Sequence, residues 1–147
     1  MKFSKLWLPV FVWCYVIYFF SDIPGLDTGL GVWDLILRKG AHITEYFVLT
    51  ILLVRAFRRS FRMLCTFLII FPSVISFLYA CSDEYHQTFI KNRCGTPWDV
   101  LVDTVGILLV IFLYIKKSKL VPPRRDDQNL IPRKHGVTET RKARRTT

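Results

Sequence analysis

The segment SDEYHQTFIKNRCGTPWDVLVD (residues 82–103) is polar, yet it lies between two long apolar runs. The run before it, FLIIFPSVISFLYA (67–80), and the run after it, VGILLVIFLYI (105–115), contain no charged residue. The segment itself contains four acidic residues, two basic residues and one histidine. Charged side chains are costly next to lipid, so we expect these groups to face the interior of a helical assembly.

The composition of the chain is typical of a membrane protein. Of its 147 residues, 52% are hydrophobic and 15% are aromatic, which is too apolar for a soluble domain of this size. A helix needs about 20 mostly apolar residues to cross a bilayer, and the stretches 6–23, 34–54, 63–80 and 98–115 qualify. Because backbone groups cannot stay unpaired in lipid, we predict an all-α membrane protein with a bundle of four transmembrane helices.

The first apolar stretch also has features of a signal peptide, namely a basic start and an apolar core of suitable length. A small-residue cleavage site does not follow it, and SDIPGLDTG (21–29) is typical of a retained polar loop. We therefore expect this stretch to remain as the first helix.

Basic residues are distributed asymmetrically along the chain. Of the 21 Lys and Arg residues, 17 lie in three places: before the first apolar stretch, between the second and third stretches, and after the fourth stretch. Short cytoplasmic loops carry an excess of Lys and Arg. We therefore predict that both termini are cytoplasmic and that the loops 21–33 and 90–97 face outward.

The chain divides into a membrane domain, residues 1–115, and a tail, residues 116–147. The tail carries eleven basic and three acidic residues and has almost no apolar periodicity, so we predict that it is disordered, cytoplasmic and attracted to anionic lipid. Residues 1–115 carry ten basic and eight acidic residues, so the net charge of +10 belongs mostly to the tail. Without aromatic or motif support, this charge does not indicate nucleic-acid binding.

The four cysteines, Cys14, Cys65, Cys81 and Cys94, do not show paired metal-ligand spacing. Packing is therefore the role we expect for them. Cys81 and Cys94 fall on the predicted outer side, where a disulfide between them stays an open alternative, because spacing alone does not establish disulfide geometry.

The second predicted helix has one polar face. Successive helical residues are rotated by about 100°, which places four polar or ionisable residues on this face, with Lys39 at its margin: Arg38, His42, Glu45 and Tyr46. This face lies in the part of the helix nearest the predicted outer side. A lone histidine on such a face is more often a hydrogen-bonded core residue than a catalyst, so the neighbouring helices are informative.

The third and fourth helices carry polar faces at the same depth. In an extension of the third helix, Asp83, His86 and Gln87 project together, while Glu84 points to the side. On the fourth helix, Asp99 and Asp103 share a face that continues to Gly106. An antiparallel bundle brings these faces to one level, so we predict a single coupled polar site.

A structural role is the alternative to a functional site. In that interpretation the basic residues neutralise the acidic residues and hold the bundle together; the basic residues are Arg38, Lys39 and Arg93, and the acidic residues are Asp83, Asp99 and Asp103. Buried ion pairs are weak evidence for stability, since apolar residues often replace them without loss. The convergence of two histidines, several carboxylates and a tyrosine favours function.

These same residues carry a resemblance to a known family. RKGAHITEYFVL (38–49) and YACSDEYHQTFIKNRCGTPWDVLVDTVG (79–106) resemble the VanZ-like family of small bacterial membrane proteins, and FFSDIPG (19–25) resembles its turn after the first helix. The resemblance covers residues 3–112. The family pattern falls on these positions: Lys39, His42, Tyr46, Asp83, Glu84, His86, Gln87, Arg93, Asp99, Asp103 and Gly106.

The resemblance implies a multi-pass protein of the bacterial cytoplasmic membrane. The family is named for a protein that raises resistance to teicoplanin, a lipoglycopeptide that binds cell-wall precursors outside the membrane. Membership alone does not establish a molecular activity. An outward-facing polar site could nevertheless contact a wall precursor, a lipid headgroup or an acyl-bearing antibiotic.

Three classes of function remain open at this stage. An enzyme acting on a lipid-linked or headgroup substrate is favoured slightly, because anion binding alone does not require so many carboxylates and histidines. The catalytic candidates are His42, Glu45, Asp83, Glu84, His86, Asp99 and Asp103. The substrate-binding candidates are Arg38, Lys39, Tyr46, Gln87 and Arg93. The alternatives are a protein that binds or shields a lipid or lipoglycopeptide, and a small proton-coupled transporter.

The cofactor requirement is also open. The acidic residues either orient a water molecule or hold a divalent metal ion. Histidine with carboxylates suits Zn²⁺ or Mn²⁺, whereas carboxylates alone suit Mg²⁺ or Ca²⁺, and the sequence does not choose between them.

Overall fold

The computed structural model describes residues 3–23, 32–90 and 96–120, with the backbone alone for residues 34, 35 and 118–120. This part of the chain forms four helices: α1 (Phe3–Ser21), α2 (Val32–Ser60), α3 (Phe67–Gln87) and α4 (Pro97–Leu120). Each contains a segment long and apolar enough to cross a membrane. The predicted all-α fold with four transmembrane helices is therefore confirmed.

The helices are longer than the apolar stretches that predicted them. The third apolar stretch ends at residue 80, and α3 continues without a break to Gln87, as the predicted extension that carries Asp83, His86 and Gln87 requires. Likewise, α4 continues to Leu120, so residues 116–120 extend the helix into the predicted tail. Hydropathy marks where lipid contact ends, whereas a helix continues as long as its backbone hydrogen bonds and packing persist. The rest of the predicted tail lies outside the described residues.

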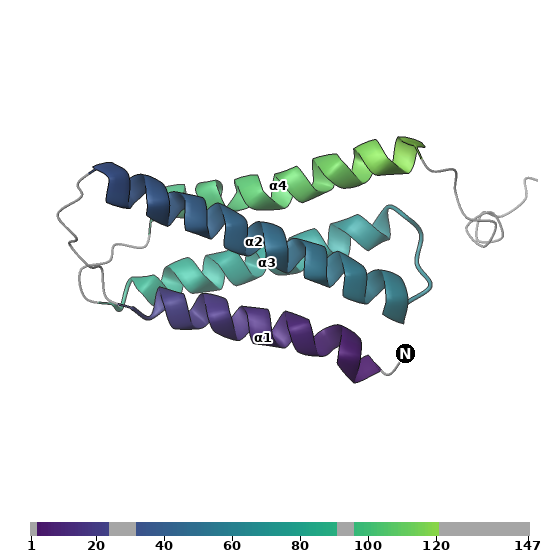
Figure 1. The fold of residues 1–147 in the computed structure, drawn as a ribbon, viewed down its shortest axis with the longest axis horizontal. Helices are drawn as coiled ribbons and strands as arrows, with labels where there is room; N and C mark the ends of the chain where they lie inside the picture. Colours follow the sequence, from purple (N-terminus) through teal and green to yellow (C-terminus); the bar gives the residue numbers. More distant parts are fainter. Residues whose placement is uncertain (1–2, 24–31, 91–95, 121–147) are drawn as a thin grey trace, which may run out of the picture.

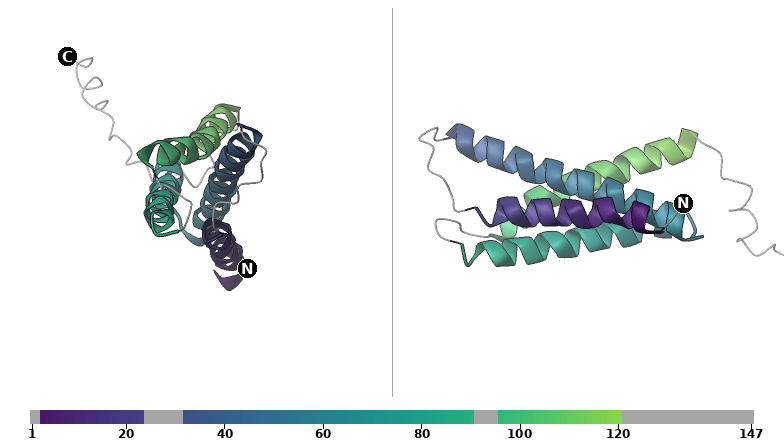
Figure 2. Two further views of the ribbon diagram at one scale, coloured as in Figure 1. Left: turned by 90° about the vertical axis from the view of Figure 1, so that its left-hand side faces the viewer. Right: turned by 60° about the horizontal axis from the view of Figure 1, so that its bottom comes forward.

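The four helices form an antiparallel bundle (Figure 1), in which α1 and α3 run in one direction and α2 and α4 in the other. Seen end-on, they form a ring in the order α1, α2, α4, α3 (Figure 2). The helices α2 and α3 each contact the three others, whereas α1 and α4 do not contact each other. The polar segments of α2, α3 and α4 therefore come from helices that all touch one another.

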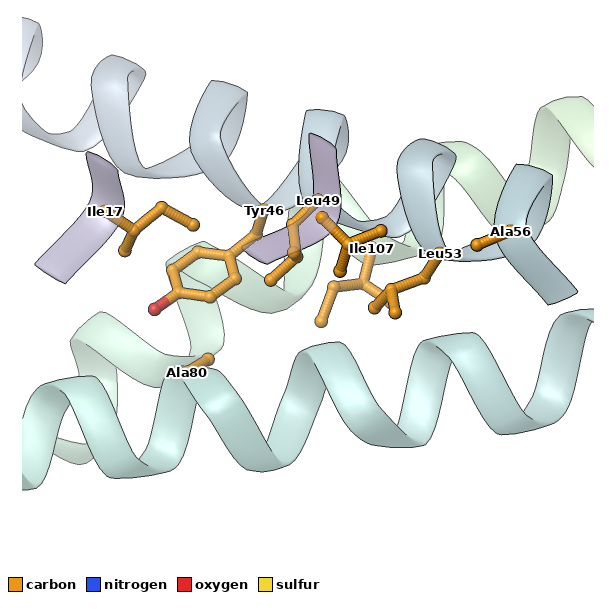
Figure 3. Packing of buried hydrophobic residues seen from close by; sticks show 8 residues of the cluster. Ile17, Tyr46, Leu49, Leu53, Ala56, Ala80 and Ile107 are labelled. Carbon is orange, nitrogen blue, oxygen red and sulfur yellow. The ribbon is translucent and has the colours of Figure 1, made fainter. Parts of the chain in front are cut away.

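The apolar core is narrow, is centred on α2 and includes residues from all four helices. Its fully buried cluster is drawn in Figure 3 and consists of Val10, Ile17, Tyr46, Leu49, Leu53, Ala56, Ala80 and Ile107. Many other large apolar side chains face outward, among them Phe11 and Phe112, with 66% and 63% exposure. An apolar exterior is the surface that a bilayer covers, so it agrees with a membrane location.

Hydrogen bonds between helices supplement this core. The Thr50 hydroxyl of α2 donates to the Ser76 hydroxyl of α3 over 2.9 Å in the buried interior. The Trp13 indole of α1 donates to the Glu45 carbonyl over 2.9 Å, and the Tyr79 hydroxyl of α3 donates to the Cys14 carbonyl over 2.7 Å. Such polar contacts help to hold transmembrane helices together, where the bilayer itself supplies little hydrophobic driving force between them.

The two ends of the bundle differ in chemistry. We call the end formed by the last turns of α1 and α3 and the first turns of α2 and α4 the polar end (left in Figure 1). The opposite end contains basic residues such as Arg58 and Arg59 in the last turn of α2 and Lys116 near the end of α4. Cys81, near the polar end, is a free thiol, and Cys94 lies outside the described residues.

Candidate functional site

His42 lies at the centre of the polar end, between two carboxylates. Its Nδ1 atom is 3.4 Å from Oε2 of Glu45, which is one turn further along α2, and 3.8 Å from Oδ1 of Asp103 on α4. The side chains of His42 and Glu45 are largely buried. Residues three apart in a helix share a face, so α2 supplies two members of this group and α4 supplies the third.

A glycine allows α4 to approach α2 at this place. A Cβ atom added to Gly106 would overlap the carbonyl oxygen of Ile43 and lie 3.0 Å from the backbone nitrogen of Phe47. A larger residue would therefore force the two backbones apart. Asp103 lies about one turn before Gly106 on α4, and His42 lies next to Ile43 on α2. The close approach of Gly106 to Ile43 therefore also brings Asp103 near His42.

Asp103 is the most deeply buried carboxylate of the site, at 1% exposure. Neither of its oxygens has a hydrogen-bond donor among the described residues. Four further carboxylates are close enough to repel a negative charge on it: Glu84, Asp83, Glu45 and Asp99. Burying a carboxylate without sufficient compensation is costly, so this arrangement is unfavourable for stability alone.

Tyr46 and Gln87 complete the buried part of the site. Tyr46 is fully buried, and its hydroxyl points toward α3 (Figure 3), near Asp83 and Asp103. This hydroxyl lacks a partner with hydrogen-bonding geometry in the described part of the chain. On α3, Nε2 of Gln87 donates to Oδ2 of Asp83 over 3.0 Å, which fixes the orientation of that carboxylate.

Lys39 and Asp99 form the partly exposed rim of the site. The Nζ of Lys39 is 3.5 Å from Oδ1 of Asp99, and the two side chains are 39% and 30% exposed. Oδ2 of Asp99 also accepts a hydrogen bond of 2.7 Å from the Thr96 hydroxyl, and the Asp99 amide donates to the Thr96 carbonyl. These contacts hold Asp99 in the first turn of α4, where a carboxylate also stabilises the helix dipole.

His86 lies elsewhere, at the junction of α1 and α3. Its ring packs on Tyr18 with centroids 4.9 Å apart, and its Nε2 is 3.9 Å from Oδ1 of Asp22. Glu84, which the sequence pattern placed to the side, is instead buried and acts on Asp103. Successive helical residues are rotated by about 100°, so Glu84 and His86 point in nearly opposite directions. The side of α3 that carries Glu84 faces the interior of the bundle.

The pattern of the VanZ/LLP1 family matches residues 6–120, which is most of the chain. The chain belongs to the VanZ/LLP1 family. Comparisons with curated proteins and with solved structures found no significant match. The VanZ-like resemblance inferred from residues 38–49 and 79–106 is therefore confirmed at the level of the family.

In this VanZ/LLP1 chain, the structure brings together most of the predicted site residues and separates others. The buried group consists of His42, Glu45, Tyr46, Asp83, Glu84, Gln87 and Asp103, with Lys39 and Asp99 at the rim. Arg38 is half-buried on the adjacent part of α2. His86 is turned toward α1, and Arg93 lies outside the described residues.

Sequence reasoning did not select Asp22 or Thr96, although each contacts a candidate residue. Signals for both exist in the sequence. Asp22 directly follows the first apolar stretch at the polar end, and Thr96 begins a Thr-Pro-Trp-Asp pattern that is typical of a capped helix start. Their partners, however, depend on how the helices pack.

A divalent metal ion, the open cofactor alternative, requires several donor atoms that converge on one point. In the described ranges, His, Cys, Asp and Glu side chains do not form a group of three or more placed to hold a metal ion. The carboxylates are near enough to influence Asp103 but are not arranged as one set of ligands. The described donor atoms therefore do not fit a divalent metal ion.

Proposed function

We propose that the polar end faces the outer leaflet of a bacterial cytoplasmic membrane and acts there on a cell-envelope component, either a lipid headgroup or a lipid-linked wall precursor. The bias of 17 of 21 basic residues toward the other side supports this orientation. In this orientation both termini are cytoplasmic. A headgroup of the outer leaflet then lies at the depth of His42.

The contact of His42 with two carboxylates carries this proposal. His42 lies 3.4 Å from Glu45 and 3.8 Å from the buried Asp103. A carboxylate next to an imidazole orients the ring and stabilises its protonated form, which is the arrangement of a general acid–base group. In this mechanism His42 transfers a proton to or from the reacting group, while Glu45 and Asp103 position the ring and balance its charge.

The residues around this centre have separate roles in the proposal. Lys39 and Arg38, at the more accessible margin, bind a phosphate group of the substrate, as does Arg93. Asp83, held by Gln87, and Glu84 line the interior next to Asp103. Asp99 places the Lys39 ammonium group at the rim.

An effect on glycopeptide susceptibility follows from this location. A lipoglycopeptide of the teicoplanin type meets both lipid and wall precursor at the outer leaflet. A protein that alters a headgroup or precursor there changes how much antibiotic reaches its target. This part of the proposal rests on the family name and on the inferred orientation.

Comparison of cells with and without the gene tests the proposed chemistry. We expect membrane lipid and wall-precursor profiles to differ in at least one species, and complementation with wild type to restore that species. His42→Ala and Asp103→Asn should not restore it at equal protein level. Thr44→Ala is a matched control on the same helix, because Thr44 is exposed and bonds only its own helix at Gly40 among the described residues.

The same experiment distinguishes catalysis from binding. If all lipid and precursor species remain unchanged while antibiotic susceptibility still depends on His42 and Asp103, the site captures or shields a ligand without converting it. If neither chemistry nor susceptibility depends on these two residues, the proposed function is wrong.

A further inference from the structure

Among the described residues of the polar end, acidic side chains outnumber the permanently charged basic ones. Five carboxylates influence this region, namely Asp103 and the four that repel it: Glu84, Asp83, Glu45 and Asp99. The permanently charged bases on the described helices beside them are Arg38 and Lys39. Among the described side chains, a ligand that enters this region therefore meets more carboxyl groups than permanently charged bases. A purely anionic headgroup suits the margin of the site but not its interior.

Lys39 lies at the rim beside Asp99, whereas the most deeply buried ionisable groups are acidic. Lys39 lies at the rim with 39% exposure, whereas Asp83 and Asp103 are buried at 5% and 1%. Along α4, the rim residue Asp99 and the buried residue Asp103 are separated by about 6 Å, given a rise of about 1.5 Å per residue. A ligand with a phosphate group and a positive group, joined by a short linker, matches this order: the phosphate fits the basic rim and the positive group fits the acidic interior.

The buried groups need hydrogen-bond donors. Both oxygens of Asp103 lack a donor among the described residues, and the oxygen of the fully buried Tyr46 lacks a partner there as well. The Tyr46 hydroxyl lies near Asp83 and Asp103 and interacts with them electrostatically, but it is not itself a carboxylate, and its lack of a partner in hydrogen-bonding geometry among the described residues is a second indication that a polar ligand belongs here. A primary ammonium group supplies three N–H donors in addition to its charge, whereas a quaternary ammonium group supplies none.

We therefore propose, on the basis of the function above, that the ligand is a zwitterionic phospholipid headgroup in which a primary amine follows the phosphate group. The ammonium group binds at Asp103 and Tyr46, and the phosphate binds at Lys39. His42 then lies between the two ends of the headgroup, on the helix that carries both Lys39 and Tyr46.

Lipid-dependent thermal stability of the purified full-length protein tests this proposal. The probes are phosphatidylethanolamine, phosphatidylcholine and phosphatidylglycerol with identical acyl chains, each added to the protein in the same detergent. We expect phosphatidylethanolamine to raise Tm with a half-saturating concentration about tenfold lower than that of either other lipid, as expected for charge-assisted hydrogen bonds that only the primary amine can donate.

Two variants connect this preference to the buried site. Tyr46→Phe removes the hydroxyl and keeps the ring, and Asp103→Asn removes the charge. Each is expected to reduce the preference for phosphatidylethanolamine over phosphatidylcholine, whereas Thr44→Ala should keep it. If Asp103→Asn does not fold, Tyr46→Phe still decides the outcome. Equal or stronger stabilisation by phosphatidylglycerol, or a preference that both variants retain, would overturn the proposal.

The outcome is independent of the test of function. A lipid profile that depends on His42, combined with a preference for phosphatidylglycerol, would support the proposed function but contradict the inference that the ligand carries a primary amine. A preference for phosphatidylethanolamine, in a protein whose gene does not alter the lipid profile, would support the amine-binding site but contradict the proposed reaction. Soluble phosphoethanolamine is a fourth probe, and stabilisation by it would show that the headgroup suffices without the acyl chains.

Discussion

Gly106 of α4 lies directly against Ile43 of α2, because a side chain at Gly106 would overlap the Ile43 carbonyl oxygen. This contact determines how close the two helices come at the polar end. One residue before Ile43, the His42 imidazole reaches to 3.8 Å from Asp103. The arrangement of the candidate site therefore depends on a residue without a side chain.

Substitution of Gly106 tests this dependence. Gly106→Ala should lower the free energy of unfolding by about 1–3 kcal/mol, as overpacking of a tight interior does, and should reduce function further by separating His42 from Asp103. Gly40→Ala is the matched control on α2, since a Cβ atom there meets nothing within 4 Å. It should be neutral or stabilising by up to about 1 kcal/mol, because alanine favours helix. Unfolding in detergent measures both variants.

Equal destabilisation by Gly106→Ala and Gly40→Ala would contradict the importance of the close contact. Wild-type stability and function of the Gly106→Ala variant would contradict it as well.

Coupling within the site is testable with a double-mutant cycle. His42→Ala and Asp103→Asn should each remove function, and the double variant should be little worse than either single variant, because residues that act as one unit are not additive. Function per folded molecule is the quantity to measure. Additive losses of stability, with wild-type function per folded molecule, would instead reduce the group to structural ion pairs.

His86 should behave differently from His42. The structure places His86 against Tyr18 and Asp22, with 30% exposure of the His86 side chain and 56% of the Asp22 side chain. A partly exposed ionic contact of this kind contributes about 1 kcal/mol or less. We therefore expect His86→Ala to keep most function and to lower stability slightly, whereas His42→Ala loses function. The lipid or precursor profile of complemented cells compares the two variants at equal protein level.

A complete loss of function in a well-folded His86→Ala protein would place His86 in the reaction. In that case the contact with α1 would belong to the site.

The membrane orientation is testable by cysteine labelling. Single cysteines at Asn92 and Asn129, in a cysteine-free background, should differ in reactivity with a membrane-impermeant thiol reagent on intact cells. The bias of basic residues predicts that Asn92 is labelled and Asn129 is protected. Labelling after lysis is the control for the reactivity of both positions. The reverse pattern would place the polar end on the cytoplasmic side and remove the argument for the outer leaflet.

The transmembrane helices were predictable because hydropathy is a local property. Twenty or so apolar residues require a helix in lipid wherever they occur, and the helical period alone places His42, Glu45 and Tyr46 on one face. Hydropathy alone does not mark the end of α3, because its last turns are polar; the extension to Gln87 was predicted from the helical spacing of its polar residues instead. In these turns Asp83, Glu84 and Gln87 are buried inside the bundle, whereas His86 contacts α1.

The sequence by itself determined the number of spanning helices, the family and the set of ionisable residues at the polar end. Only the tertiary structure decided which of them meet: Asp103 and Glu45 lie beside His42, Glu84 turns inward, and His86 turns to α1. The reason is that the rotation of a helix about its own axis depends on contacts along its whole length with several neighbours. A contact such as Gly106 on Ile43 joins residues far apart in the chain, so no local pattern encodes it.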